Sequence, residues 1–141
     1  MKLDNPLLEY LGIRLLEWEP GRCVFDLEIE PRHLNRQASL QGGVTATLLD
    51  AACGYAGLQS TADAPPDNAV TVMLTISYVS KVQQGRIKAI GRVTGSGRRM
   101  YFAAAELYAE DGRLVATAQG TFKRSSSAAS ARQDKETSNV T

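Results

Sequence analysis

The sequence predicts an α+β fold, in which a six-stranded, mostly antiparallel β-sheet curls around one long buried helix. Three observations predict it: the order of helical and strand-like runs, one helical run that is apolar on nearly every face, and the Asp111-Gly112 pair between two strand-like runs. Asp-Gly is a strong signal for a tight hairpin turn. A lone helix that is apolar all round has to be covered on several sides, so the sheet must curl.

A short helix and two strands are expected in the N-terminal part of the chain. The helix is expected to begin at Pro6, directly after Asn5, because Asn is a good N-cap and Pro suits the first helical position. Strands are expected over residues 13–19 and 22–30. In the second strand apolar and polar residues alternate, which predicts one buried face and one solvent-exposed face that includes Asp26.

The long helix is expected over residues 43–60, followed by a loop at 61–68 that contains a Pro-Pro pair. Four strands complete the sheet, and they are expected at residues 70–79, 87–94, 101–109 and 114–122. In the first of these, apolar residues alternate with mostly polar ones from Val70 to Val79 without a break. Such alternation is typical of a strand with two distinct faces.

The composition of the chain limits its partners. The 141 residues include 16 Lys and Arg against 15 Asp and Glu, a formal net charge of +1, and no run reaches 18 apolar residues. Nucleic acid and membranes are therefore not expected partners. We expect a soluble cytoplasmic protein with one domain over residues 1–123. A disordered tail is expected over residues 124–141, because this segment has no aromatic residue, Leu, Ile or Met.

The two cysteines, Cys23 and Cys53, are too few for a disulfide framework or a zinc site. Cys23 lies in a strand-like run and Cys53 in the predicted long helix. Such cysteines usually behave as small buried apolar residues, so we expect two buried thiols and no metal.

Chemistry is concentrated between residues 33 and 50, HLNRQASLQGGVTATLLD, where Gln41-Gly42-Gly43 opens the long helix. Glycines let a ligand approach the backbone, and the free amide groups of a helix start attract negative charge. Such a site suits a carbonyl oxygen that becomes an oxyanion. The alternative is that the glycines only form a tight turn into the helix.

Asp50 lies in the middle of the helix among Leu and Ala residues, where a carboxylate must be paired, protonated or functional. It could be a general base or a nucleophile, or a structural hydrogen-bonded Asp. Gly42 and Asp50 are eight residues apart, a rise of about 12 Å along one helix. If both are catalytic, two subunits must share the site, which predicts a two-fold dimer.

The run NxxAxxQGGxxxTLxDxAxG over residues 35–54 resembles the PaaI-like hotdog acyl-CoA thioesterases, whose pattern is NxxGxxHGG followed by TLxDxA. The resemblance covers roughly residues 5–123 and implies the hotdog fold. It implies that Asp50 is the catalytic carboxylate and that the Gly42 N–H polarises the thioester carbonyl. It further implies that the Asn35 amide positions the reacting groups and that Thr71 stands where some relatives have a Ser that orients water. Without the family, Thr71 is an ordinary strand residue.

Two residues depart from the family pattern. Ala38 replaces a Gly, which matters only if the turn needs a positive φ. Gln41 replaces a His, and Gln can hydrogen-bond but cannot deliver a proton near pH 7. If that His protonates the leaving thiolate, this protein should be slower; if it only orients the substrate, little is lost. His33, the only His, lies eight residues upstream of Gln41 and is expected to be a loop residue.

The resemblance implies a coenzyme A thioester as substrate, with the pantetheine arm between subunits and no separate cofactor. Gly43 and Tyr55 are expected to bind the substrate, and Tyr55 is expected to help shape the pocket. Candidate phosphate contacts, each of which could equally be a solvated surface charge, are Lys81, Arg98, Arg99 and Lys123.

The expected function is hydrolysis of an acyl-CoA thioester by a homodimer or homotetramer. A non-catalytic hotdog protein that binds acyl-CoA or a small ligand remains the alternative, because Gln41 replaces the family His. A hydratase or dehydratase is disfavoured, since such sites typically rely on a His and His33 is poorly placed.

Overall fold

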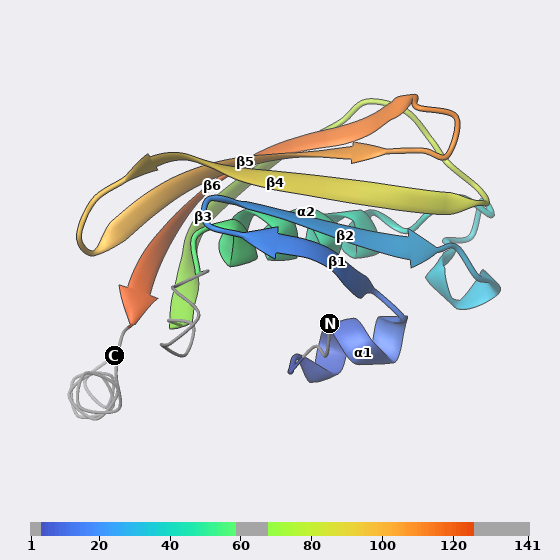
Figure 1. The fold of residues 1–141 in the computed structure, drawn as a ribbon. Coiled ribbons are helices and arrows are strands. Elements are labelled where there is room, and N and C mark those ends of the chain that lie inside the picture. The colour runs from blue at the N-terminus through green and yellow to red at the C-terminus, as the bar shows by residue number, and fades with distance from the viewer. Residues whose placement is uncertain (1–3, 59–67, 126–141) are drawn as a thin grey trace, which may run out of the picture.

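The computed structural model describes residues 4–58 and 68–125 and confirms the predicted architecture of one antiparallel sheet and one long helix (Figure 1). The helices are α1 (Pro6–Leu11) and α2 (Gly42–Ala56), with a short 3-10 turn, η1 (Pro31–His33). The strands are β1 (Arg14–Glu19), β2 (Arg22–Glu28), β3 (Asn68–Tyr78), β4 (Arg86–Ser96), β5 (Met100–Tyr108) and β6 (Leu114–Ser125). Their order in the sheet is β1-β2-β4-β5-β6-β3, so β1 and β3 are the edge strands. The sheet arches over α2, as Figure 1 shows.

The C-terminal ends of α2 and β6 differ most from the expected ranges. Helix α2 ends at Ala56 and is followed by Gly57, four residues before the predicted end. Strand β6 continues to Ser125, so the expectation that the disordered tail begins at residue 124 is wrong for residues 124 and 125. The strand therefore includes Arg124, whose guanidinium lies over the Tyr101 ring and donates to the Gly57 carbonyl at 2.6 Å. The predicted 61–68 loop, except its last residue, and the tail from residue 126 on lie outside the described residues.

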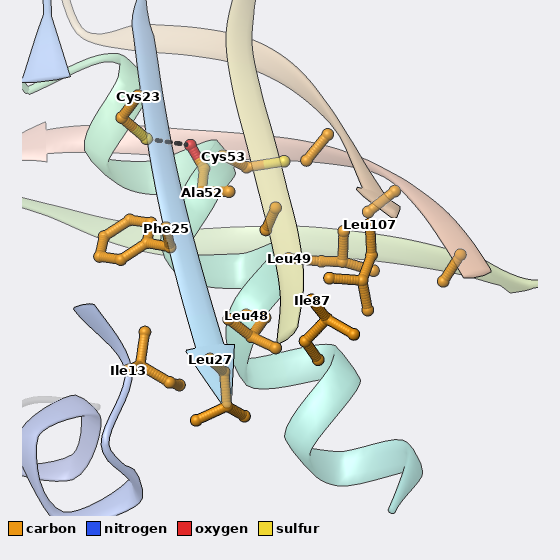
Figure 2. Packing of buried hydrophobic residues seen from close by; sticks show 14 of the residues in the cluster. Ile13, Cys23, Phe25, Leu27, Leu48, Leu49, Ala52, Cys53, Ile87 and Leu107 are labelled. Carbon is orange, nitrogen blue, oxygen red and sulfur yellow. Dashed lines mark hydrogen bonds between the residues drawn. The ribbon is translucent and has the colours of Figure 1, made fainter. Parts of the chain in front are cut away.

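The core forms where α2 packs against the concave face of the sheet (Figure 2). β4 passes so close to α2 that a Cβ at Gly91 would lie 2.0 Å from the Ala52 carbonyl oxygen. Only glycine permits that approach. The Cys23 thiol donates to the same carbonyl oxygen at 3.0 Å.

Both cysteines are free and buried, as predicted. Burial raises the pKa of each thiol, Cys23 and Cys53, to about 12. Both therefore stay protonated at neutral pH and pack as small apolar groups.

The predicted solvent-exposed face of β2 is wrong at Asp26, which is only 1% exposed. Its carboxylate accepts hydrogen bonds from Arg14 at 2.8 and 2.9 Å and from Arg86 at 3.0 Å. Burial acts to raise the pKa of Asp26, but the hydrogen bonds from the two guanidinium groups outweigh burial and lower it. Asp26 on β2 thus forms ion pairs with a residue on each of the neighbouring strands β1 and β4.

Candidate functional site

Asp50 is half-buried on α2 and is held by the edge strand β3. The Thr71 hydroxyl donates a hydrogen bond to Asp50 Oδ1 at 2.9 Å. This contact leaves the second carboxylate oxygen without a hydrogen bond among the described residues. The carboxylate is therefore oriented by the Thr71 hydroxyl.

A β-bulge aims Thr71 at the helix. The pairing of β3 with β6 shifts between Thr71 and Met73, so that Thr71 lies opposite Phe122 and Leu74 lies opposite Gly120. Three steps along β3 thus match two along β6, and Thr71 shares the helix-facing side with Leu74. Unbroken alternation would have placed these two residues on opposite faces.

A cavity of about 210 Å³ lies beside Asp50. Its walls come from α1, from one face of α2, and from β3, β5 and β6: Asn5, Leu7, Leu8, Thr47, Ala51, Gly54, Tyr55, Leu58, Ala69, Thr71, Tyr101 and Phe122. Among the described residues, Asp50 is the only charged one that lines it. The cavity is therefore mostly apolar, with a carboxylate at its wall.

Tyr55, an expected substrate contact, lines this cavity from α2. Its ring packs against Trp18 and Phe25 at centroid distances of 5.4 and 5.2 Å, and its hydroxyl accepts from Asn5 Nδ2 at 3.4 Å. Burial raises the pKa of Tyr55, so the hydroxyl stays protonated. Tyr55 is thus both a core residue and part of the cavity wall.

The start of α2 carries the second set of candidate groups. Gln41 is the N-cap, and its carbonyl accepts from the Val44 and Thr45 amides at 2.9 and 3.2 Å. The N–H groups of Gly42 and Gly43 have no acceptor among the residues that the structure describes. Free amides at a helix start carry partial positive charge and favour an anion.

The contacts within this chain do not explain why two glycines stand there. A Cβ at Gly43 would meet nothing within 4 Å, and one at Gly42 would make an ordinary contact of 3.5 Å with the Tyr78 hydroxyl. Alanine would fit at both positions and favour the helix by about 1 kcal/mol each. Packing among the described residues therefore does not require glycine at either position.

Asn35 contributes to the local loop through one atom only. Its Oδ1 accepts from the Gln37 and Ser39 amides at 2.9 and 3.1 Å. Its NH₂ group makes no hydrogen bond in the described parts of the chain. The side-chain oxygen thus organises the loop, and the amide nitrogen remains available to a ligand.

The same loop requires a residue in the left-handed region. Ala38 has φ of 59° and is the only non-glycine residue described with a positive φ. The Gly-to-Ala departure noted in the sequence therefore places a Cβ where the backbone disfavours one.

Gln41 and His33 lie in different environments, one exposed and one buried. The Gln41 side chain is exposed and does not cap the helix. His33 is fully buried in η1. Its Nδ1 accepts from the Glu30 amide at 2.9 Å, and its Nε2 lies 2.7 Å from the Leu11 carbonyl oxygen. Both ring nitrogens are thus engaged, and His33 ties η1 to the end of α1.

A second cavity, of about 430 Å³, lies at the helix start and is lined by residues that include Asn35, Gly42, Tyr78 and Lys81. It shares no described lining residue with the cavity beside Asp50. These two cavities therefore lie at the two ends of β3.

The four candidate phosphate contacts divide between the two ends of β3. Lys81 follows β3 and lines the cavity at the helix start. Lys123 pairs in register with Val70 near the opposite end of β3. Arg98 and Arg99 lie in the β4–β5 turn at that same end, where the Arg124 amide donates to the Arg99 carbonyl. The structure does not bring all four together within one chain.

Sequence reasoning missed Tyr78. Its hydroxyl donates to the Gly42 carbonyl oxygen at 2.9 Å, which joins the end of β3 to the start of α2. The only signal in the sequence is that Tyr78 is the one aromatic residue of the alternating run from Val70 to Val79.

Two classes of feature are absent from residues 4–58 and 68–125. No group of three or more His, Cys, Asp or Glu side chains is placed to hold a metal ion. None of the helices in these ranges has the length and apolar character needed to span a membrane.

Comparison with known proteins places this arrangement among thioester-cleaving folds. A sequence profile of the thioesterase superfamily matches residues 38–116. The candidate esterase PA0474 of Pseudomonas aeruginosa is 35% identical over 84% of this chain and 88% of its own length. Human acyl-coenzyme A thioesterase 13 is 31% identical over 77% of each chain. A mutant of the phenylacetic acid degradation protein PaaI from Thermus thermophilus is 30% identical, with a TM-score of 0.74 over 85% of this chain and 99% of its own.

Proposed function

This chain belongs to the thioesterase superfamily, as a PaaI-like protein with the hotdog fold, and we propose that it hydrolyses acyl-CoA thioesters at a site shared by two subunits. In this proposal Asp50 is the general base or nucleophile. The Gly42 N–H polarises the thioester carbonyl, and the Asn35 amide nitrogen helps to position the reacting groups.

The observation that carries the proposal is the separation of two half-sites, namely the cavity beside Asp50 and the cavity at the start of α2. The oriented carboxylate of Asp50 and the free amides at Gly42 line different cavities of one chain. Neither half-site alone combines a base or nucleophile with a donor for a developing oxyanion. A second copy of the chain would supply the missing half.

The edge strand β3 supports such a pairing. Among the described strands it pairs only with β6, so its other edge has unpaired backbone groups. Large apolar side chains exposed on or next to β3 are Val70, Val72, Met73, Tyr78 and Val79. Two copies related by a two-fold axis would pair their β3 strands antiparallel. That pairing sets the Thr71 end of one strand beside the Tyr78 end of the other, and hence Asp50 near the partner's Gly42.

The same pairing would bring the four candidate phosphate-binding side chains of the two subunits close together. Lys81 of one subunit would approach Lys123, Arg98 and Arg99 of its partner, because these groups lie at opposite ends of β3. Together they offer positive charge to the phosphates of coenzyme A. Gly43 would border the thioester.

The chemistry needs no proton donor at Gln41. Asp50 would either take a proton from a water molecule that attacks the carbonyl carbon, or attack that carbon itself and form a mixed anhydride that water then hydrolyses to the free acid. In both routes the Gly42 N–H would hold the carbonyl oxygen. The bond to sulfur would then break and release a coenzyme A thiolate, which is a good leaving group. Gln41 would only orient the substrate by hydrogen bonds.

A second candidate function is binding of an acyl-CoA or small ligand without hydrolysis. It is favoured by the exposed Gln41 side chain, which stands where the family pattern has a His and cannot deliver a proton near pH 7. A thiol-release assay with aromatic, short-chain and long-chain acyl-CoAs separates the two functions. If the protein hydrolyses acyl-CoA, the wild type should release thiol, and a folded Asp50→Ala variant should release almost none. Gln41→His should release thiol faster than the wild type if the introduced side chain also delivers a proton. Binding of acyl-CoA with no thiol release from the wild-type protein would favour the second function.

A further inference from the structure

We propose that Tyr78 is a positioning residue that fixes the start of α2, so that the Gly42 and Gly43 N–H groups point at the substrate. This inference rests on the proposed function, because it assigns a role within the same site. It adds a residue outside the sequence motif that carries the family resemblance.

Tyr78 reaches Gly42 by two kinds of contact. It lies opposite the buried Ala116 in the β3–β6 register, so its side chain leaves the strand on the helix-facing side. Its hydroxyl donates to the Gly42 carbonyl oxygen at 2.9 Å. Two ring carbons lie 3.6 and 3.7 Å from the position that a Cβ of Gly42 would occupy.

The start of α2 needs such an anchor. Two successive glycines give the least restricted backbone that a helix can have in its first turn. The Gln41 side chain makes no capping hydrogen bond. The Tyr78 hydroxyl therefore holds this turn through the Gly42 carbonyl oxygen. It does so without occupying the N–H groups to which a capping side chain would bind.

The hydrogen bond also acts on the peptide group between Gly42 and Gly43. The carbonyl that Tyr78 contacts and the Gly43 N–H belong to that one peptide group. Donation to its oxygen polarises the N–H, since linked hydrogen bonds strengthen one another. The contact thus orients one free donor directly and fixes the neighbouring Gly42 donor through the backbone.

Tyr78 is not a core residue. Its side chain is largely exposed, at 58%, in the single chain. A Tyr78→Phe change keeps the ring and removes only the hydroxyl. The variant therefore tests the hydrogen bond with little change in packing.

The matched control is Tyr108→Phe. Tyr108 lies at the end of β5, and its hydroxyl makes no hydrogen bond within the described ranges. The two substitutions remove the same atom. Melting temperature and oligomeric state are measured for both variants.

We expect Tyr78→Phe to lower kcat for acyl-CoA about threefold to tenfold, the effect of losing one neutral hydrogen bond, with KM nearly unchanged. Tyr108→Phe should leave kcat as in the wild type. A wild-type kcat in Tyr78→Phe overturns the inference. A lower kcat accompanied by unfolding at the assay temperature or by loss of the dimer also overturns it, because the role would then be structural.

Amide hydrogen exchange tests the anchor without any activity. The Val44 and Thr45 amides bond to the Gln41 carbonyl in the first turn. Tyr78→Phe should speed their exchange several-fold, while Tyr108→Phe should not. Unchanged exchange rates contradict the inference even if the wild-type protein hydrolyses acyl-CoA. A wild-type protein that hydrolyses no acyl-CoA would refute the proposed function while leaving this measurement decisive for the anchor.

Discussion

The Thr71 hydroxyl and Asp50 Oδ1 are joined by a 2.9 Å hydrogen bond that exists because β3 bulges between Thr71 and Met73. An extra residue in an edge strand thus places a hydroxyl on the carboxylate that lines the apolar cavity. Bulges near functional sites commonly re-aim a side chain in this way.

Replacing Thr71 by Val should lower kcat for acyl-CoA about tenfold or more, because a hydrogen bond to a charged carboxylate is lost while side-chain shape is kept. Thr71→Ser, which keeps the hydroxyl, should retain most of the activity. Steady-state thiol release measures both variants. Equal losses in the Val and Ser variants would mean that the hydroxyl has no role in turnover.

Gly42→Pro removes the proposed oxyanion donor at a position where proline is tolerated. Gly42 is the first helical residue, and Gln41 before it has φ of −62° and ψ of 135°, which suits a residue preceding proline. We expect kcat to fall about 100-fold to 1,000-fold, as for loss of one oxyanion donor.

Gly42→Ala is the control for that variant, because it adds a Cβ but keeps the N–H. Its loss of activity should be clearly smaller than that of Gly42→Pro. Circular dichroism and melting temperature check that both variants are folded. Equal kcat values in the two variants would remove the Gly42 N–H from the mechanism.

Ala38→Gly should stabilise the protein by about 1 kcal/mol, because the native φ of 59° is unfavourable for a residue with a Cβ. Urea unfolding followed by circular dichroism measures the change. An Ala38→Gly variant no more stable than the wild type would show that the loop carries no strain at this position.

Asp26 should make stability depend on pH in the acid range. Its pKa is lowered in the folded protein, so its contribution is present above the unfolded value near 4 and is lost as the pH falls through the folded value. Asp26→Asn should cost about 2 kcal/mol at pH 7, because hydrogen bonds to a charged group are lost. Urea unfolding at several pH values should show the difference from wild type narrowing as the pH falls from about 6 towards about 3. A constant difference would contradict this linkage.

The order of elements could be predicted because its signals are local. The Asn-Pro start of α1 is confirmed by the Leu8 amide, which donates to the Asn5 side chain at 3.3 Å. The Asp111-Gly112 turn forms where expected, with Gly112 at a positive φ of 88°. Helix α2 is predicted by its apolar faces, which the sheet covers.

The pairing of distant residues could not be predicted in the same way. The alternation of apolar and polar residues runs through the β3 bulge unchanged, so it gives no sign that Thr71 faces the helix. Asp26 looked exposed because its partners Arg14 and Arg86 come from neighbouring strands. Tyr78 was missed for the same reason, since its contact with Gly42 spans 36 residues.

The most direct test of the shared site is a heterodimer of Asp50→Ala and Gly42→Pro subunits, purified through two different affinity tags. Each variant alone should be nearly inactive. If Asp50 of one subunit acts with Gly42 of its partner, one of the two sites in the heterodimer is intact, and thiol release should recover to about half of the wild-type rate. A heterodimer as inactive as its parents would contradict the account, because it would place both residues in the same subunit's site.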